Sequence, residues 1–128
     1  EFNGGELTFE QQNRVLKDVR CVVYGGTWPA SYTLSIMEYM MTGTPVVVID
    51  KQMAMSPVPE VLDFYEVEEI IKSCNGMVAH TTQEMIDLTQ TLLEDFKFAK
   101  QLSDRQRAKA LELFSKERIA KEWAAYLR

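Results

Sequence analysis

The fold is decided by residues 21–50, CVVYGGTWPASYTLSIMEYMMTGTPVVVID. The two ends of this stretch, residues 21–24 and 46–49, are short apolar runs rich in β-branched side chains, and neither alternates with polar residues. That pattern is typical of strands that are buried on both faces of a parallel sheet. The stretch therefore predicts two parallel strands joined by the residues between them.

The connection between the two predicted strands has the signals of a helix. Leu34, Met37 and Met41 recur at helical spacing, with Ile36 and Met40 alongside them. Gly43 stands where helices commonly end, and Pro45 cannot continue one. The stretch as a whole thus predicts a β-α-β unit.

A polar turn, residues 25–35, lies between the first strand and the helix. A right-handed crossover places it at the carboxyl end of the strand and the amino end of the helix, where open α/β sheets bind ligands. The unpaired N–H groups of the first helical turn favour a phosphate there, and Ser31, Thr33 and Ser35 offer hydroxyl donors. The alternative is that these hydroxyls only cap the helix, because Ser35 and Glu38 have capping-box spacing.

The segments on either side of this unit predict further elements. Thr8 and Gln11 form a capping-box pair that predicts a helix over residues 9–17. Two prolines predict a loop over residues 51–59, beside the ligand edge of the sheet. Residues 60–73 have a moderately helical pattern.

A third short strand is predicted at residues 77–79, after the turn at Cys74, Asn75 and Gly76. His80 is the only histidine and follows this strand directly. Its position favours a structural hydrogen-bonding role over acid–base catalysis, although imidazole chemistry permits both.

The last third of the chain is expected to be wholly helical. One helix should run from Thr81 to Leu93, a second should open at Ser103, which has capping spacing to Gln106, and a third should follow Ser115. The third carries apolar residues at helical spacing: Ile119, Trp123, Tyr126 and Leu127.

Length and composition bound the class of protein. The 128 residues suffice for one domain or part of one, and 46% of them are hydrophobic. No apolar run reaches the length of a membrane span and no secretory signal opens the chain. The two cysteines do not make a disulfide framework, so a reducing cytoplasm is the expected compartment.

The net charge of −5 is unevenly distributed. Residues 1–96 carry 5 basic and 15 acidic residues, whereas residues 97–128 carry 9 basic and 4 acidic residues. The acidic body argues against a nucleic-acid partner, because backbone binding needs a broad basic face. The basic tail is expected to be a solvated helix face, with peripheral contact to an anionic membrane surface as the alternative.

Five motifs in a fixed order resemble a known family. They are SYTLSIMEYMMTGTPVVV, VPEV, NGMV, LLED and RAKALELFSKERI. Their order is similar to the C-terminal, donor-binding domain of GT-B glycosyltransferases, above all the retaining group with the signature E-G-F-G-x-x-x-x-E-A-M-A-x-G-x-P-V-V. The resemblance covers nearly the whole chain. It implies a Rossmann-like, three-layer α/β fold with short parallel strands and a helical C-terminal third, as part of such a domain.

The resemblance also implies roles for individual residues. Glu38 falls on the second glutamate of the signature, which contacts the ribose of a nucleotide-sugar. Thr33, Leu34 and Ser35 fall on the turn whose backbone N–H groups approach the diphosphate, and Ser31 and Tyr32 belong to the same nucleotide-sugar-binding turn. The family generally uses no metal and no further cofactor, and nothing in this chain resembles a metal-binding Asp-x-Asp motif.

The chain also departs from the family pattern. Ala30 replaces the first glutamate of the signature, which meets the sugar or its phosphate, and Ser31 and Thr33 replace its flexible glycines. Two β-α units and the acceptor-binding N-terminal domain that normally precede this region are not present in the sequence. The chain is therefore expected to be an incomplete donor-binding half, inactive alone, whose partners are a nucleotide-sugar and an N-terminal acceptor domain.

Two alternatives follow from these departures. Ala30 favours a glycosyltransferase-like binding or scaffold module whose catalytic role has lapsed. A phosphate-binding or regulatory α/β domain unrelated to sugars would explain the helix-end turn but not the ordered motifs. In either case the exposed edges of a small parallel sheet favour pairing with a second copy as a homodimer.

Overall fold

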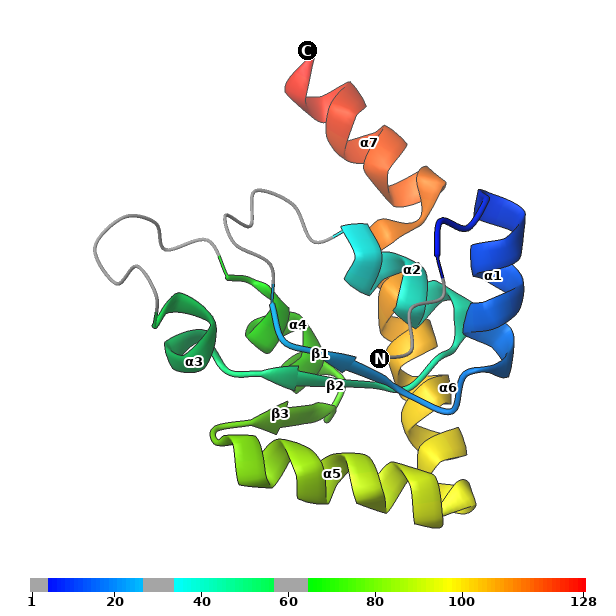
Figure 1. The fold of residues 1–128 in the computed structure, drawn as a ribbon. Helices are drawn as coiled ribbons and strands as arrows, with labels where there is room; N and C mark the ends of the chain where they lie inside the picture. The colour runs from blue at the N-terminus through cyan, green and yellow to red at the C-terminus, as the bar shows by residue number, and fades with distance from the viewer. Residues whose placement is uncertain (1–4, 27–33, 57–64) are drawn as a thin grey trace.

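The computed structural model describes residues 5–26, 34–56 and 65–128. The fold is a three-stranded parallel sheet interleaved with helices and followed by a long helical region (Figure 1). The strands are β1 (Val22–Tyr24), β2 (Val46–Ile49) and β3 (Met77–Ala79), in the order β1-β2-β3. The predicted α/β class, all three strands and their parallel direction are thereby confirmed.

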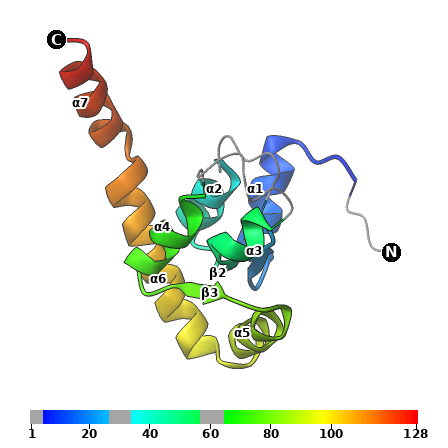
Figure 2. The same ribbon diagram turned by 90° about the vertical axis from the view of Figure 1, so that its left-hand side faces the viewer.

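The helices form two layers around this sheet. α5 packs against β2 and β3 on one face, while α1, α2 and α4 lie on the other (Figures 1 and 2). Their bounds are α1 (Phe9–Asp18), α2 (Leu34–Thr42), α3 (Lys51–Met55), α4 (Val67–Ser73), α5 (Thr82–Glu94), α6 (Phe96–Phe114) and α7 (Lys116–Tyr126).

The central strand, β2, is buried on both faces, as expected. Val46, Val47 and Val48 have no exposed surface. The same expectation was wrong for β1, where 51% of Val23 is exposed. The reason is that β1 is an edge strand among the described residues, and α5 packs over β2 and β3 instead.

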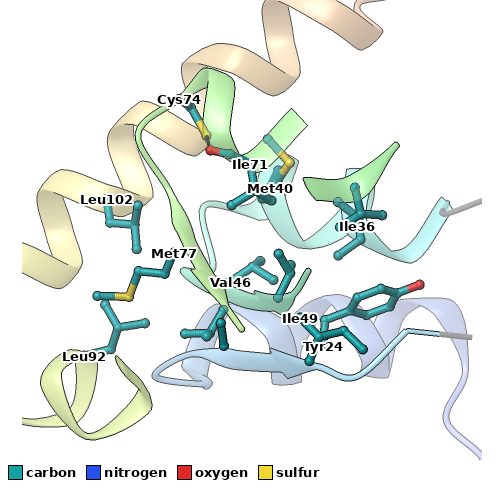
Figure 3. Close-up of a cluster of buried hydrophobic side chains, with 14 of the residues drawn as sticks. Tyr24, Ile36, Met40, Val46, Ile49, Ile71, Cys74, Met77, Leu92 and Leu102 are labelled. Atoms are coloured by element: carbon teal, nitrogen blue, oxygen red, sulfur yellow. Dashed lines mark hydrogen bonds between the residues drawn. The ribbon is translucent and has the colours of Figure 1, made fainter. Parts of the chain in front are cut away.

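Helix α2 buries part of the apolar set that predicted it. Ile36 and Met40 are fully buried against the sheet, whereas 60% of Leu34 is exposed. Figure 3 shows Met40 beside Ile71 of α4, with Ile36 farther along α2. Because α2 is apolar nearly all round, its spacing could not determine which stripe faces the core. Its predicted end is confirmed, since Gly43 takes the left-handed conformation with φ of 79°.

The starts of α1, α5 and α7, each capped by a local hydroxyl side chain, were predicted correctly. Thr8 accepts a hydrogen bond from Gln11 N–H, and Gln11 Oε1 accepts one from Thr8 N–H. Thr81 likewise accepts from the N–H of Glu84 at the start of α5. Ser115 accepts from the N–H of Arg118 at the start of α7.

Three other expectations need correction. The predicted loop at 51–59 begins as the helix α3, because Asp50 caps it, and 57–59 lie outside the described residues. The helix predicted over 60–73 begins only at Val67 in α4, and 60–64 lie outside the described residues. Ser103 opens no helix, because α6 runs through it from the Asp95 cap. The Ser103 hydroxyl instead donates to the carbonyl of Gly43.

Helix α6 crosses the amino edge of the sheet and completes it. The side-chain amide of the fully buried Gln106 accepts a hydrogen bond from Val46 N–H (3.0 Å) and donates one to Val46 C=O (3.1 Å). β3 pairs with β2 only from Val47 onward, so Gln106 continues the ladder by one residue. Gly76 makes room for this arrangement, because a Cβ there would lie 2.5 Å from Ile71 Cγ2.

The last helix, α7, extends away from the sheet (Figures 1 and 2). Its predicted apolar stripe is present but exposed, with 59% of Trp123 and 83% of Tyr126 accessible. Among the described residues, no helix combines the length and the apolar character needed to cross a membrane.

The first prediction concerns Gln106. Replacing it with Leu leaves the buried N–H of Val46 without a partner, so the free energy of unfolding should fall by about 1 to 3 kcal/mol. Urea unfolding followed by circular dichroism measures this. Gln101→Leu, at an exposed position of the same helix, is the matched control and should change stability by less than about 0.5 kcal/mol. Equal losses in the two variants would contradict the role given to Gln106.

Candidate functional site

The candidate site lies at the carboxyl edge of the sheet. All three strands are parallel, so the residues that follow them gather at one edge. Gly25 and Gly26 follow β1, Asp50 follows β2 and His80 follows β3. Three strand ends thus bring together residues that are far apart in the sequence.

Asp50 connects two of these strand ends. Its Oδ1 accepts a hydrogen bond from Met53 N–H (2.7 Å), which caps α3, and its Oδ2 lies 2.7 Å from His80 Nδ1. The backbone N–H of Asp50 also donates to the carbonyl of Ala79 (2.9 Å). One nearly buried carboxylate therefore fixes the start of α3 and the imidazole after β3.

The environment of Asp50 favours its ionised form. Burial acts to raise the pKa of this carboxyl group, but the hydrogen bonds from Met53 N–H and His80 oppose it, together with the charge of Lys72 and, when the imidazole is protonated, that of His80. The pKa of Asp50 is lowered on balance. The carboxylate is therefore charged at neutral pH and acts only as an acceptor.

Tyr65 closes the site behind β2. Its buried hydroxyl donates to the carbonyl of Ile49 (2.9 Å). Burial, assisted by the neighbouring Tyr24, Glu68 and Asp50, raises the pKa of Tyr65 far above its ordinary value, so the phenol stays protonated. The chain leaving β1 passes close by, because a Cβ on Gly26 would lie 4.0 Å from the Tyr65 ring.

Glu68 of α4 ties a further element to this edge. Its carboxylate accepts hydrogen bonds from Lys51 N–H (2.6 Å) and from the Lys72 ammonium. The Lys72 hydrogen bond, followed by that from Lys51, lowers the pKa of Glu68. Both carboxylates at the β2 end of the edge are thus ionised at neutral pH, and this part of the site favours neutral hydroxyls over further anions.

The residues predicted to bind a nucleotide-sugar fall in two groups. Ser31, Tyr32 and Thr33 lie outside the described residues, as does Ala30. Leu34 and Ser35 are the first described residues of α2, which follows β1 in the chain. Ser35 is inside the helix, so the capping box expected between Ser35 and Glu38 is not formed.

Glu38 has a partner in another helix instead. Its Oε2 accepts a hydrogen bond from Gln12 Nε2 of α1 (3.2 Å). This is the one hydrogen bond that the Glu38 side chain makes within the described ranges. The contact is only partly buried, so the carboxylate keeps the capacity to accept further hydrogen bonds.

The pairing of His80 with Asp50 was not predicted. The sequence favours a structural hydrogen-bonding role for His80, and the structure gives its imidazole a hydrogen bond to the buried carboxylate of Asp50 at the ligand edge. A sequence signal existed, because each residue directly follows a predicted strand. Parallel neighbouring strands bring such residues together.

The described part of the chain contains no cluster of three or more histidine, cysteine, aspartate or glutamate side chains that could hold a metal ion. Comparison of the chain with models of known protein families, with curated proteins and with solved structures gives no match.

The second prediction concerns pH and Asp50. Its pKa is lower in the folded chain than the ordinary value of about 4 in the unfolded chain. Its stabilising contribution is therefore complete above that value and is lost as the pH falls through the folded-state pKa. Asp50→Asn should make the free energy of unfolding less dependent on pH in this acidic range, as measured by urea unfolding from pH 7 downward.

Asp87→Asn is the control, because Asp87 is exposed on α5. It should keep the pH dependence of the unsubstituted chain. If Asp50→Asn keeps that dependence too, the Asp50 carboxylate is not linked to folding in the way described.

Proposed function

We propose that this chain is the donor-binding half of a glycosyltransferase and binds a nucleotide-sugar whose sugar is transferred to an acceptor held by another domain. The observation that carries the proposal is the placement of α2. Helix α2 follows β1 and precedes β2 in a β-α-β unit, so its amino end is on the side of the carboxyl ends of the strands. The later strands, β2 and β3, are added in order on one side of β1. The ordered sequence motifs supply the sugar-nucleotide class.

The strand order supports a position within a larger sheet. A doubly wound sheet has the order 3-2-1-4-5-6, and its ligand crevice lies where the order reverses, between strands 1 and 4. Three consecutive strands in the order β1-β2-β3 fit either half of such a sheet, because both halves run outward from the crevice in chain order. β1 would then border the crevice, which agrees with the exposure of Val23 on this edge strand.

The chemistry of binding follows from this placement. The amino end of α2 offers N–H groups and the positive end of a helix dipole to the diphosphate. Glu38, one turn into the helix, has carboxylate oxygens that can accept hydrogen bonds from two vicinal ribose hydroxyls. No metal and no cofactor is part of the proposal.

The proposed partners are the nucleotide-sugar and an acceptor-binding N-terminal domain. The outer edge of β1, which no strand among the described residues covers, is equally suited to a second copy of the chain, and the exposed stripe of α7 to an anionic membrane face. Both are secondary to the donor site. A cytoplasmic location, in part at the membrane surface, belongs to the same proposal.

A second candidate is a module that binds the nucleotide-sugar but no longer takes part in transfer. Ala30 favours it, because a glutamate of the signature is missing there. The two candidates differ when the chain is combined with an acceptor-binding domain. Transfer of labelled sugar by the combined protein supports the enzyme, and binding without transfer supports the module.

The third prediction tests the donor site. Isothermal titration of the folded chain with uridine and guanosine diphosphates and their glucose and mannose conjugates should show binding of at least one conjugate. Glu38→Gln keeps the volume and an oxygen for Gln12 but removes one acceptor, so binding should weaken by about 1 to 3 kcal/mol.

Gln12→Ala is the matched control, since it removes the helix–helix hydrogen bond and leaves the Glu38 carboxylate intact. It should leave the affinity within about twofold. If both variants lose affinity equally, Glu38 acts only through its contact with α1 and not through the ligand. If the folded chain binds none of these ligands, the proposed function is wrong.

A further inference from the structure

We propose that His80, held by Asp50, is a hydroxyl-binding residue of the site, and that its Nε2 accepts a hydrogen bond from the sugar part of the donor. The inference rests on the proposed function and adds to it a specific contact with the sugar. His80 is not among the residues that the sequence motifs imply. Its assignment comes from the contacts at the ends of β2 and β3.

The contact with Asp50 determines which ring nitrogen carries the proton. Both oxygens of Asp50 are engaged, one by Met53 N–H and the other by His80 Nδ1 (2.7 Å each). An ionised carboxylate accepts hydrogen bonds and donates none. Nδ1 of His80 must therefore carry a hydrogen in either protonation state of the ring. The proposed contact is one that the neutral imidazole makes, because its lone pair is then on Nε2.

The ring is fixed from two sides yet remains accessible. The backbone N–H of His80 donates to Glu84 Oε2 of α5 (2.7 Å), while Nδ1 is held by Asp50. The side chain is 54% exposed, and its Nε2 makes no hydrogen bond within the described ranges. An oriented acceptor at the ligand edge is thus available to a bound molecule.

The surrounding charges define the kind of group that binds. Carboxylates of Asp50 and Glu84 contact His80, and Glu68 lies on the same edge with its partner Lys72. The negative charges of these carboxylates would repel a phosphate group, whereas a neutral hydroxyl can donate a hydrogen bond to Nε2. Among the parts of a nucleotide-sugar, the hexose is the neutral polyol.

The position of His80 suits that part of the donor. β1 and β3 flank β2, so their carboxyl ends are about two strand spacings apart, or roughly 10 Å. A diphosphate at the amino end of α2 therefore leaves the space toward β3 for the sugar. His80 stands at the far side of that space.

The fourth prediction is tested by nuclear magnetic resonance of the full chain. His80 is the only histidine, so its imidazole signals need no assignment by mutation. Long-range proton–nitrogen spectra should show the tautomer with hydrogen on Nδ1. Uridine diphosphate glucose or guanosine diphosphate mannose should shift the Nε2 signal, whereas the plain diphosphates should leave it in place.

Two variants separate binding from structure. In His80→Asn the amide nitrogen can replace Nδ1 beside Asp50, but nothing replaces Nε2, so affinity for the sugar conjugate should fall about 5- to 10-fold while affinity for the plain diphosphate stays constant. In His80→Gln the amide can replace Nε2, and part of the lost affinity should return.

Three results would overturn the inference. A conjugate that binds without shifting the Nε2 signal removes the contact but leaves the donor site standing. Equal losses for the conjugate and the plain diphosphate in His80→Asn indicate a structural role alone. Absence of all binding by a folded chain overturns the proposed function and this inference with it.

Discussion

The structure depends on one strand, β2, being hydrogen-bonded along both of its edges. β1 occupies one edge, and β3 with the side-chain amide of Gln106 occupies the other. The strand has apolar side chains buried on both faces, so its polar backbone has no access to water and every group needs a partner. Where β3 is one residue too short, Gln106 of α6 supplies the acceptor for Val46 N–H and a further donor to Val46 C=O. Helix α6 is thereby hydrogen-bonded to the sheet.

The site follows from the same strand. Because β2 ends at Ile49, the next residue, Asp50, stands at the carboxyl edge between the ends of β1 and β3. Its carboxylate caps α3 and holds His80, while Tyr65 satisfies the last carbonyl of the strand. A buried charge is tolerated there because hydrogen-bond donors meet both of its oxygens. The positions of these side chains are therefore set by the core, which favours a preorganised site.

Much of the fold could be predicted because its signals are local. Apolar runs locate all three strands, and hydroxyl residues at Thr8, Thr81 and Ser115 locate the helices that follow them. Two local aspartate caps, Asp50 before α3 and Asp95 before α6, were missed, and the other errors arose where a distant partner decides the role of a residue. Ser103 has the spacing of a cap but bonds to Gly43, sixty positions away, and Glu38 bonds to Gln12 rather than to its own helix.

The candidate site was predictable only in part, for the same reason. Spacing and resemblance direct attention to the turn before α2, where Ser31, Tyr32 and Thr33 lie outside the described residues. The contact between Asp50 and His80 joins positions thirty residues apart, and no local pattern encodes it. It becomes visible only when β2 and β3 are placed side by side in parallel.

The central claim is that the carboxyl edge of this sheet binds a nucleotide-sugar. The most direct measurement maps backbone amide shifts of the folded chain during titration with uridine diphosphate glucose and guanosine diphosphate mannose. We expect the shifts to concentrate in the first turn of α2 and in the residues that follow β2 and β3. Shifts confined to the basic helices α6 and α7 would contradict the account, because they would mark charge attraction rather than a site built by the sheet.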